Sequence, residues 1–332
     1  MTSGNGSDNS ATVAFLGPVN SYTHRATKNA FSDPKWTFAP TTTIKEVFDR
    51  VQSGHAPYGV VPFENSTHGA VTFTLDSLAD RANEYPDIVV CDEVYLDIHH
   101  FLLGRLPEGS SSSSSSSVSP DKGVPLTPLT HLRRVYSHPQ AFGQTAGFLR
   151  RYLPGVETVE VSSTSRAAEL AKADESGTSA AIASESAGKA IGLDVLARWI
   201  EDREDNTTRF FVLRRGEGWN GGGVPGRDQD QAGEEEETVA AAGHKSLVSF
   251  TVPHRRAGAL ADVLNRFRGW GLNLTSISSV PSLDGPFQYL FFVEFEGGRF
   301  DDPEGRVGGV LEDLEGVAER WRWLGSWRNR RE

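Results

Sequence analysis

Four polar clusters in the first two thirds of the 332-residue sequence hold the side chains that could do chemistry. Each cluster lies beside a short apolar run, so we expect each at a strand end, where α/β sheets bind their ligands. The clusters are residues 17–23 (GPVNSYT), 64–69 (ENSTHG), 137–141 (SHPQA) and 206–210 (NTTRF). Together they offer hydroxyls, amides, imidazoles and a guanidinium, which can bind an anion and donate hydrogen bonds.

The first two clusters also have an ordinary structural explanation. Ser21 or Thr23 could cap the helix that follows the first cluster, and residues 65–67 could cap the next helix. A glycine-containing loop in front of a helix could equally expose backbone N–H groups to an anion. Taken alone, neither cluster therefore distinguishes a ligand site from a helix start.

The other two clusters are ambiguous in the same way. His138 invites comparison with a catalytic triad, but no G-x-S-x-G motif provides a nucleophile, and Pro139 suits the first turn of a helix. We therefore expect His138 to be structural. Arg209 could hold a carboxylate in two-point contact, or it could pair with Asp202 or Glu204 at the surface.

Composition excludes several classes of function. The net charge of −11 disfavours nucleic acid and anionic membranes as partners. The single cysteine, Cys91, allows neither an internal disulfide nor a thiolate metal site, and we expect it to be a buried apolar residue. No Walker loop and no H-E-x-x-H is present, so we expect no cofactor and no metal.

The distribution of apolar residues predicts where in the cell the protein is found. No run of about 18 apolar residues occurs, which predicts no membrane span. Residues 1–10 are polar and lack the features of a secretory signal. We therefore expect a cytoplasmic protein.

The elements before residue 216 must position the four clusters. Short apolar runs alternate with helix-like stretches there, which predicts an α/β fold with a mostly parallel sheet. The expected strands are 12–16, 58–62, 88–93, 135–137, 158–161 and 180–184, and the expected helices are 44–51, one around 75–78, 141–152 and 166–173.

After residue 244 the pattern changes. Strands are expected at 247–252, 272–280, 287–295 and 321–324, and helices at 257–267 and 307–317. This order, βαββαβ, is that of a ferredoxin-like module, whose exposed edge strand favours pairing with a second copy.

Two low-complexity stretches interrupt these patterns. An unbroken serine run at 110–117 indicates a disordered insertion of about residues 107–127. The acidic, glycine-rich stretch 216–244 indicates a flexible linker.

Taken in order, the four clusters resemble the motifs of the prephenate dehydratase family, whose N-x-T-R-F motif is unchanged at residues 206–210. Residues 255–260, 272–275 and 324–326 resemble the ACT domain that follows the catalytic unit in that family. The resemblance implies a two-lobed, periplasmic-binding-protein-like catalytic domain at 11–215, with the active site between its lobes, and a ferredoxin-like ACT regulatory domain at 245–329.

The resemblance also implies the activity. A hydro-lyase of this family converts prephenate to phenylpyruvate, CO2 and water in L-phenylalanine biosynthesis, as a homodimer or homotetramer that L-phenylalanine inhibits. Catalytic roles fall on Thr208, as donor to the departing hydroxyl, and on Arg209, as ligand of a carboxylate. The other implied residues are Ser21, Thr23, Asn65, Ser66, Gln140 and Phe210 for substrate, and Gly258, Ala259, Leu260, Asn273 and Leu274 for phenylalanine.

Two departures from the family pattern leave questions open. The usual Gly-Thr-Tyr-Ser of the first motif is Asn-Ser-Tyr-Thr at 20–23, so a glycine is lost while the hydroxyls persist. The usual Glu-Ser-Arg-Pro of the ACT domain is Ser-Ser-Val-Pro at 278–281, which leaves the strength of control and the identity of the effector open. Arogenate, the amino acid form of the substrate, stays an alternative, as does a silent amino-acid-binding regulator, although the unchanged residues 208–210 argue against the regulator.

Overall fold

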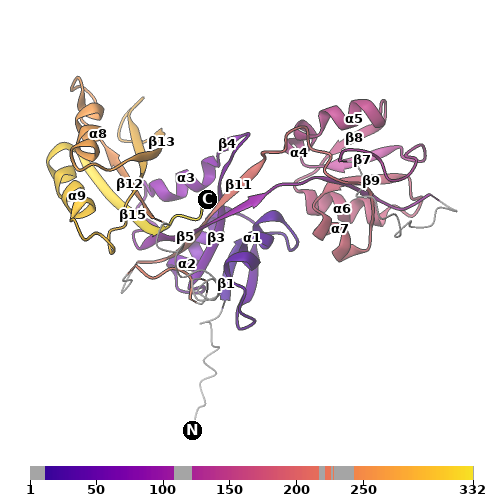
Figure 1. Ribbon diagram of the computed structural model, residues 1–332, viewed down its shortest axis with the longest axis horizontal. Helices are drawn as coiled ribbons and strands as arrows, with labels where there is room; N and C mark the ends of the chain where they lie inside the picture. Colours follow the sequence, from indigo (N-terminus) through magenta and orange to yellow (C-terminus); the bar gives the residue numbers. More distant parts are fainter. Residues whose placement is uncertain (1–11, 108–121, 217–220, 226, 228–242, 332) are drawn as a thin grey trace, which may run out of the picture. The chain divides into compact units, whose positions relative to one another are not determined.

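The structure is a computed structural model that describes residues 12–107, 122–216, 221–225, 227 and 243–331 (Figure 1). These residues form two compact units. Unit 1 comprises the chain up to Leu16, Ala26–Tyr95 and the chain from Arg209 onward, and unit 2 comprises Gly17–Arg25 and Leu96–Thr208. The serine run and most of the predicted linker lie outside the described residues, and the predicted domain boundaries stay predictions.

Unit 1 begins with an α/β sheet whose strands follow the order β2-β1-β3-β11-β5. Strand β1 pairs in parallel with both β2 and β3. The bounds are β1 (Thr12–Leu16), β2 (Thr37–Thr41), β3 (Tyr58–Asn65), β5 (Ile88–Asp97) and β11 (Thr207–Arg215), with the short β4 (Gly69–Ala70) paired to β3. The helices are α1 (Tyr22–Ala30), α2 (Ile44–Gln52) and α3 (Thr72–Ala79).

Helix α2 illustrates how the sequence specifies this packing. Its buried residues Ile44, Val47, Phe48 and Val51 follow the i, i+3, i+4, i+7 spacing of one helix face. A Cβ atom at Gly59 on β3 would lie 2.6 Å from Val47 Cγ1, so only glycine lets the helix approach this closely.

Unit 2 contains the second sheet, in the order β8-β7-β9-β6-β10. Strand β7 is parallel to β8 and β9, whereas β6 is antiparallel to β9 and β10. The strands are β6 (Phe101–Gly104), β7 (Arg134–Ser137), β8 (Glu157–Glu160), β9 (Ser179–Ala183) and β10 (Asp194–Ala197), and the helices are α4 (Pro139–Gln144), α5 (Ala146–Tyr152), α6 (Thr164–Ala173) and α7 (Glu185–Ile191).

Both sheets share one topology. The strand order β2-β1-β3-β11-β5 of the first sheet corresponds to β8-β7-β9-β6-β10 of the second. The fourth strand in each order, β11 or β6, is the first that the chain forms after it crosses from the other unit. This repeated order confirms the predicted two-lobed, periplasmic-binding-protein-like α/β fold.

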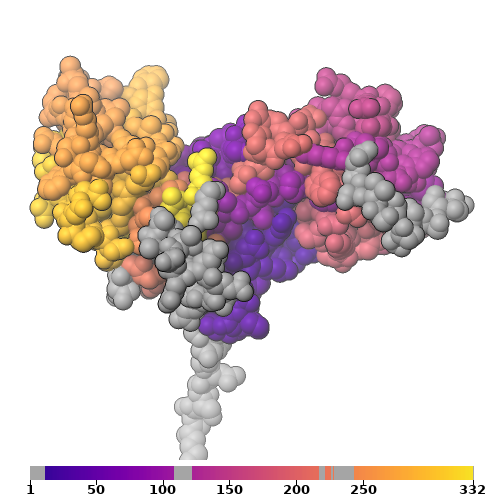
Figure 2. All heavy atoms as spheres, viewed as in Figure 1, coloured from indigo at the N-terminus to yellow at the C-terminus, as the bar shows by residue number. Residues whose placement is uncertain are grey.

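The C-terminal module, residues 244–328, confirms the predicted βαββαβ order. Its sheet runs β13-β14-β12-β15, and its atoms form one body, drawn in orange to yellow in Figure 2. The apolar stripes of both helices pack on one face of this sheet, around Val248, Phe267, Phe295 and Leu314. The elements are β12 (His244–Thr251), α8 (Ala259–Gly269), β13 (Leu274–Pro281), β14 (Tyr289–Glu296), α9 (Arg306–Val317) and β15 (Arg320–Arg328).

The C-terminal module is joined directly to the first sheet, which the sequence did not predict. Strand β15 lies parallel to β5 with Gly325 opposite Val90, so one ten-stranded sheet runs through unit 1. The Trp327 ring contacts Phe211 edge-on at 5.2 Å, and Phe211 stacks on Phe63 at 3.9 Å. Aromatic side chains from the module and from the α/β sheet therefore share one core.

Three local details differ from the sequence-based expectation. The single helix expected at 141–152 is divided at Thr145, whose hydroxyl donates to the Ala141 carbonyl at 2.8 Å. The strand expected from Phe287 begins at Tyr289, because Phe287 has a φ of +60° and lies in a turn. The short elements β2, β6, β10 and α7 were not predicted, because runs of four to seven residues are too short to show a clear periodicity. In the described part of the chain, no helix is long and apolar enough to span a membrane.

The pairing of β15 with β5 at Gly325 predicts that this residue tolerates no side chain. Its φ is +138°, and a Cβ atom there would lie 2.0 Å from the Val90 carbonyl oxygen. We expect Gly325→Ala to lower the free energy of unfolding by at least about 2 kcal/mol, since backbone strain alone costs this much. Urea unfolding measures this value.

A glycine on the surface of the same module provides the control. Gly308 lies in helix α9, and a Cβ atom there would have nothing within 4 Å. We expect Gly308→Ala to stabilise the protein by about 0.5 kcal/mol, because alanine is the better helix former. Equal effects of the two substitutions would contradict the close approach at Gly325.

Candidate active site

Thr208, the predicted hydrogen-bond donor, is the second residue of β11 and is half-buried. The neighbouring backbone is held firmly, because the Ile98 N–H donates to the Asn206 carbonyl at 2.8 Å. The Thr207 hydroxyl donates to Asp97 Oδ1 at 2.7 Å. Thr208 thus follows a fixed segment, at the point where the chain passes from unit 2 into unit 1.

The first motif forms the start of α1. The Ser21 hydroxyl accepts from the His24 N–H at 3.2 Å, which confirms it as the helix cap, and Thr23 is buried. Asn20 has a φ of +66°. Asparagine is one of the few residues with a side chain that tolerates this conformation, so the glycine usual at this position is replaced without loss of the turn.

Sequence reasoning missed a partly buried hydrogen-bond network in unit 2 that starts from this motif. The Tyr22 hydroxyl donates to the His99 carbonyl at 2.9 Å, and His99 Nδ1 lies 2.9 Å from Glu201 Oε1. The His100 N–H donates to Glu201 Oε2 at 2.9 Å, and His100 Nε2 lies 2.7 Å from Gln144 Oε1. Burial raises the pKa of Tyr22 and lowers that of His100, so both side chains stay uncharged near neutral pH.

A polar pair at the end of a strand was the signal that could have revealed this network. His99 and His100 lie two and three residues after the end of β5, and Glu201 lies five residues before the fourth motif. The network holds the Ser21–Thr23 segment against the residues that lead to Thr208, all within unit 2.

His138 is structural, as expected. Its Nδ1 accepts from the Gln140 N–H at 3.2 Å, so the imidazole caps α4, with Pro139 at the first helical position. Burial lowers the pKa of His138, which keeps the nitrogen free to accept. The Gln140 side chain is exposed.

The second motif forms a turn rather than a helix cap. Asn65 Oδ1 accepts from the Thr67 N–H at 3.0 Å, the His68 N–H at 3.1 Å and the Thr67 hydroxyl at 2.6 Å. The possibility that residues 65–67 cap the next helix is wrong, because α3 begins only at Thr72. This turn leaves Ser66 exposed and Asn65 buried.

Arg209 has partners that the sequence did not suggest. Its Nε donates to Glu93 Oε2 at 2.8 Å and its Nη2 to Glu294 Oε2 at 2.6 Å, and its side chain is only 7% exposed. The suggested surface pairing with Asp202 or Glu204 is wrong. The prediction that Arg209 binds a carboxylate of the substrate stays a prediction.

The predicted substrate residues are divided evenly between the units. Unit 2 contains Ser21, Thr23, Gln140 and Thr208, whereas unit 1 contains Asn65, Ser66, Arg209 and Phe210. Phe210 is fully buried in unit 1, and Cys91 is buried as expected, with its thiol 3.5 Å from the Val212 carbonyl.

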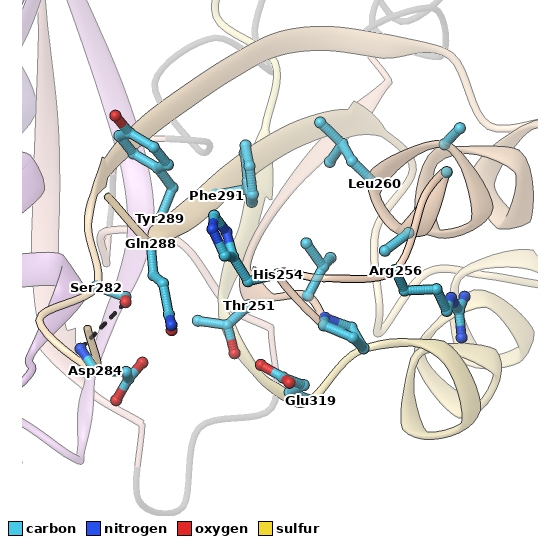
Figure 3. A pocket seen from close by; sticks show the side chains of 15 residues that line it. Thr251, His254, Arg256, Leu260, Ser282, Asp284, Gln288, Tyr289, Phe291 and Glu319 are labelled. Carbon is cyan, nitrogen blue, oxygen red and sulfur yellow. Dashed lines mark hydrogen bonds between the residues drawn. The ribbon is translucent and has the colours of Figure 1, made fainter. Parts of the chain in front are cut away.

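The C-terminal module contains a cavity of about 240 Å³ (Figure 3). Three of the five predicted phenylalanine-binding residues, Gly258, Ala259 and Leu260, line it, whereas Asn273 and Leu274 do not. Leu260 and Phe291 lie toward one end of the cavity, and the carboxylates of Asp284 and Glu319 lie toward the other. Arg256 also lines the cavity, so the site suits a small molecule with an apolar part and charged groups.

Among the residues that the structure describes, no group of three or more histidine, cysteine, aspartate or glutamate side chains could hold a metal ion. Apart from Arg209 and Phe210, the predicted catalytic and substrate residues carry neutral hydroxyl and amide side chains.

Comparison with known proteins agrees with the identity and the order of these motifs. Residues 13–218 match the family model for prephenate dehydratase. The bifunctional chorismate mutase/prephenate dehydratase of Neisseria gonorrhoeae is 34% identical over 316 residues, which cover 95% of this chain and 74% of the relative.

Two solved structures are similar over nearly the whole chain. Prephenate dehydratase from Arthrobacter aurescens, in complex with L-Phe, is 28% identical with a TM-score of 0.74, and the match covers 96% of this chain and 90% of that one. GqqA, described as a novel type of quorum-quenching acylase, is 26% identical with a TM-score of 0.72, over 96% and 97% of the two chains. The family model matches most of the α/β part of the chain, and the Neisseria relative is 34% identical over 95% of it. The chain therefore belongs to the prephenate dehydratase family.

Proposed function

We propose that this chain removes water and CO2 from prephenate to give phenylpyruvate, the decarboxylating dehydration of L-phenylalanine biosynthesis. The observation that carries the proposal is the complete set of family motifs in order, with residues 206–210 unchanged, inside a matching fold. A cytoplasmic location stays a prediction.

The chemistry requires help mainly at one atom. Loss of the ring carboxylate as CO2 and of the ring hydroxyl makes the ring aromatic, which supplies the driving force. The hydroxyl is a poor leaving group, and a positioned donor typically accelerates such a step by about 10²–10⁴-fold. We assign this donor to Thr208, which hydrogen-bonds the departing oxygen; the high pKa of an alcohol means that the proton is transferred only in part or comes from a further partner.

The other motif residues orient the dianionic substrate. Ser21, Thr23, Asn65, Ser66 and Gln140 offer hydroxyl and amide donors for its carboxylates and its oxo group. These contacts follow the family resemblance residue by residue.

Arg209 and Phe210 follow Thr208 on β11. Direct binding of a substrate carboxylate by Arg209 would use its Nη1 or an exchange of partners, because Nε and Nη2 already hold Glu93 and Glu294. Phe210 is proposed to shape the ring site from within the core of unit 1.

We further propose that L-phenylalanine binds the C-terminal module and inhibits the enzyme, in a homodimer or homotetramer. The Arthrobacter relative is described in complex with L-Phe. In this chain the cavity at Gly258–Leu260 offers Leu260 and Phe291 to an aromatic ring, and Asp284 and Glu319 to an ammonium group. Contacts of Asn273 and Leu274 with the effector stay predictions.

Two other substrates must be tested beside prephenate. Arogenate differs only in carrying an amine in place of the side-chain oxo group, which changes local contacts alone. The acylase relative shows that a protein of this fold has also been described with another activity. Comparing kcat/KM on prephenate, arogenate and an N-acyl substrate distinguishes the three activities.

The role of Thr208 predicts a graded series of variants. Thr208→Val keeps the shape but removes the hydroxyl, so we expect kcat on prephenate to fall by about 10²-fold or more. Thr208→Ser keeps a hydroxyl and should retain part of the activity. Phenylpyruvate formation, followed by absorbance, measures both variants.

The neighbouring threonine provides a matched control. Thr207 hydrogen-bonds Asp97 and has no proposed contact with the substrate. Thr207→Val should therefore change kcat far less than Thr208→Val. A folded Thr208→Val enzyme with near-normal kcat would remove Thr208 from the mechanism.

Effector binding predicts a shift in thermal stability. L-Phenylalanine at about one hundred times its Kd should stabilise the folded chain by about 2.7 kcal/mol and raise the melting temperature. Leu260→Gln should abolish the shift, because it places a polar group where the ring packs. Leu126→Gln, at a partly exposed leucine of unit 2, is the control and should leave the shift intact. An unchanged melting temperature of the wild-type chain in millimolar phenylalanine would contradict the proposal.

A further inference from the structure

Four buried charged side chains meet in unit 1. Arg209 pairs with Glu93 and Glu294, and Lys245 Nζ lies 3.4 Å from Glu93 Oε1 and 3.6 Å from Glu294 Oε1. None of the four side chains is more than 7% exposed. We call Arg209, Glu93, Glu294 and Lys245 the ion cluster.

The ion cluster is balanced in charge and in hydrogen bonds. Two positive and two negative groups cancel, which buried ions require. The outer oxygens are also occupied, because the Thr275 hydroxyl donates to Glu294 Oε1 at 2.7 Å and the Arg330 N–H donates to Glu93 Oε1 at 2.9 Å. Burial would raise the pKa of Glu93, but Arg209 and Lys245 lower it below its ordinary value, so the carboxylate stays charged.

Aromatic rings surround the guanidinium of Arg209. Its Cζ lies 4.9 Å from the ring centre of Phe211, 5.4 Å from that of Phe63 and 5.9 Å from that of Trp327. Such rings attract a cation and exclude water. The Tyr95 ring lies 5.6 Å away as well, and a side chain held by two carboxylates and four rings has little freedom to move.

The ion cluster joins the C-terminal module to the two strands on which the chain crosses between the units. The chain leaves unit 1 after Tyr95 on β5 and re-enters it at Arg209 on β11. Glu93 and Arg209 therefore lie on the two strands that connect the units. Glu294 on β14 and Lys245 on β12 belong to the C-terminal module. The module therefore supplies half of the charges that hold both crossing strands.

We infer that Glu294 of the C-terminal module is a positioning residue for the dehydration, acting through Arg209 on Thr208, the adjacent residue of β11. The inference rests on the proposed role of Thr208. Without the Glu294 carboxylate, the Arg209 guanidinium loses one of its two acidic partners. The start of β11 is then held less firmly at Arg209, the residue next to the proposed donor Thr208. Misplacement of a catalytic group by about 1 Å can cost 10²-fold in rate.

The first test replaces the carboxylate by an amide of the same shape. We expect Glu294→Gln to lower kcat on prephenate by roughly tenfold or more and to change KM by a smaller factor, because the donor is misplaced while Arg209, the proposed carboxylate ligand, keeps its charge. Steady-state kinetics and the melting temperature are measured on the same full-length sample.

A second variant separates positioning from stability. Glu294→Gln leaves the ion cluster with one excess positive charge, and the double variant Glu294→Gln/Lys245→Met restores neutrality. We expect the double variant to regain melting temperature while kcat stays low, because Arg209 still lacks its second carboxylate. Recovery of kcat together with melting temperature would show a merely structural role and overturn the inference.

Another contact between the C-terminal module and the first sheet is the control. Arg322 on β15 donates to the Tyr85 carbonyl at 2.7 Å and the Ile88 carbonyl at 2.8 Å, outside the ion cluster. Arg322→Gln should lower the melting temperature and leave kcat unchanged; an equal loss of kcat in Arg322→Gln and Glu294→Gln would contradict a specific path through Arg209. An active wild-type enzyme with a fully active Glu294→Gln variant overturns only this inference, whereas a wild-type chain that leaves prephenate unchanged overturns the proposed function as well.

Discussion

The close approach of Gly325 to Val90 is the constraint on which the organisation of unit 1 depends. It lets β15 lie beside β5, so the sheet of the C-terminal module continues the α/β sheet. Once the backbones meet there, Trp327 reaches Phe211, Glu294 reaches Arg209, and Lys245 reaches Glu93. The C-terminal module therefore shares a core with β11, the strand of the proposed donor Thr208, and a ligand of the module would have a physical route to that strand.

The motif residues combine local backbone roles with the roles proposed in catalysis. Ser21 caps α1, His138 caps α4 and Asn65 closes the β3–β4 turn, each by accepting from backbone N–H groups that would otherwise lack partners. These bonds fix the loops from which the proposed donors emerge. The same side-chain types therefore recur at both levels, because a loop that binds an anion must first satisfy its own backbone.

The departures from the family pattern affect the two regions differently. Asn20 adopts the positive φ that a glycine would otherwise supply, so the first loop keeps its form. In the C-terminal module, Val280 is buried and Ser278 is half-buried on β13. Neither side chain carries the charge usual at its position, so recognition of an amino acid effector here falls to other groups, among which Asp284 and Glu319 line the cavity.

The sequence by itself determined the repeating elements and the motif order. Apolar periodicity predicted most strands and helices, including the βαββαβ module. The spacing of apolar residues such as Val47 and Val51 shows which face of an element is buried. The motifs predicted the family, and the lack of a nucleophile motif predicted that His138 is structural. Tertiary structure alone decided which charges meet: Arg209 and Glu294 are 85 residues apart, and no local pattern links them. It also decided the joint at Gly325, since one backbone's approach to another depends on the packing of whole sheets rather than on neighbouring residues.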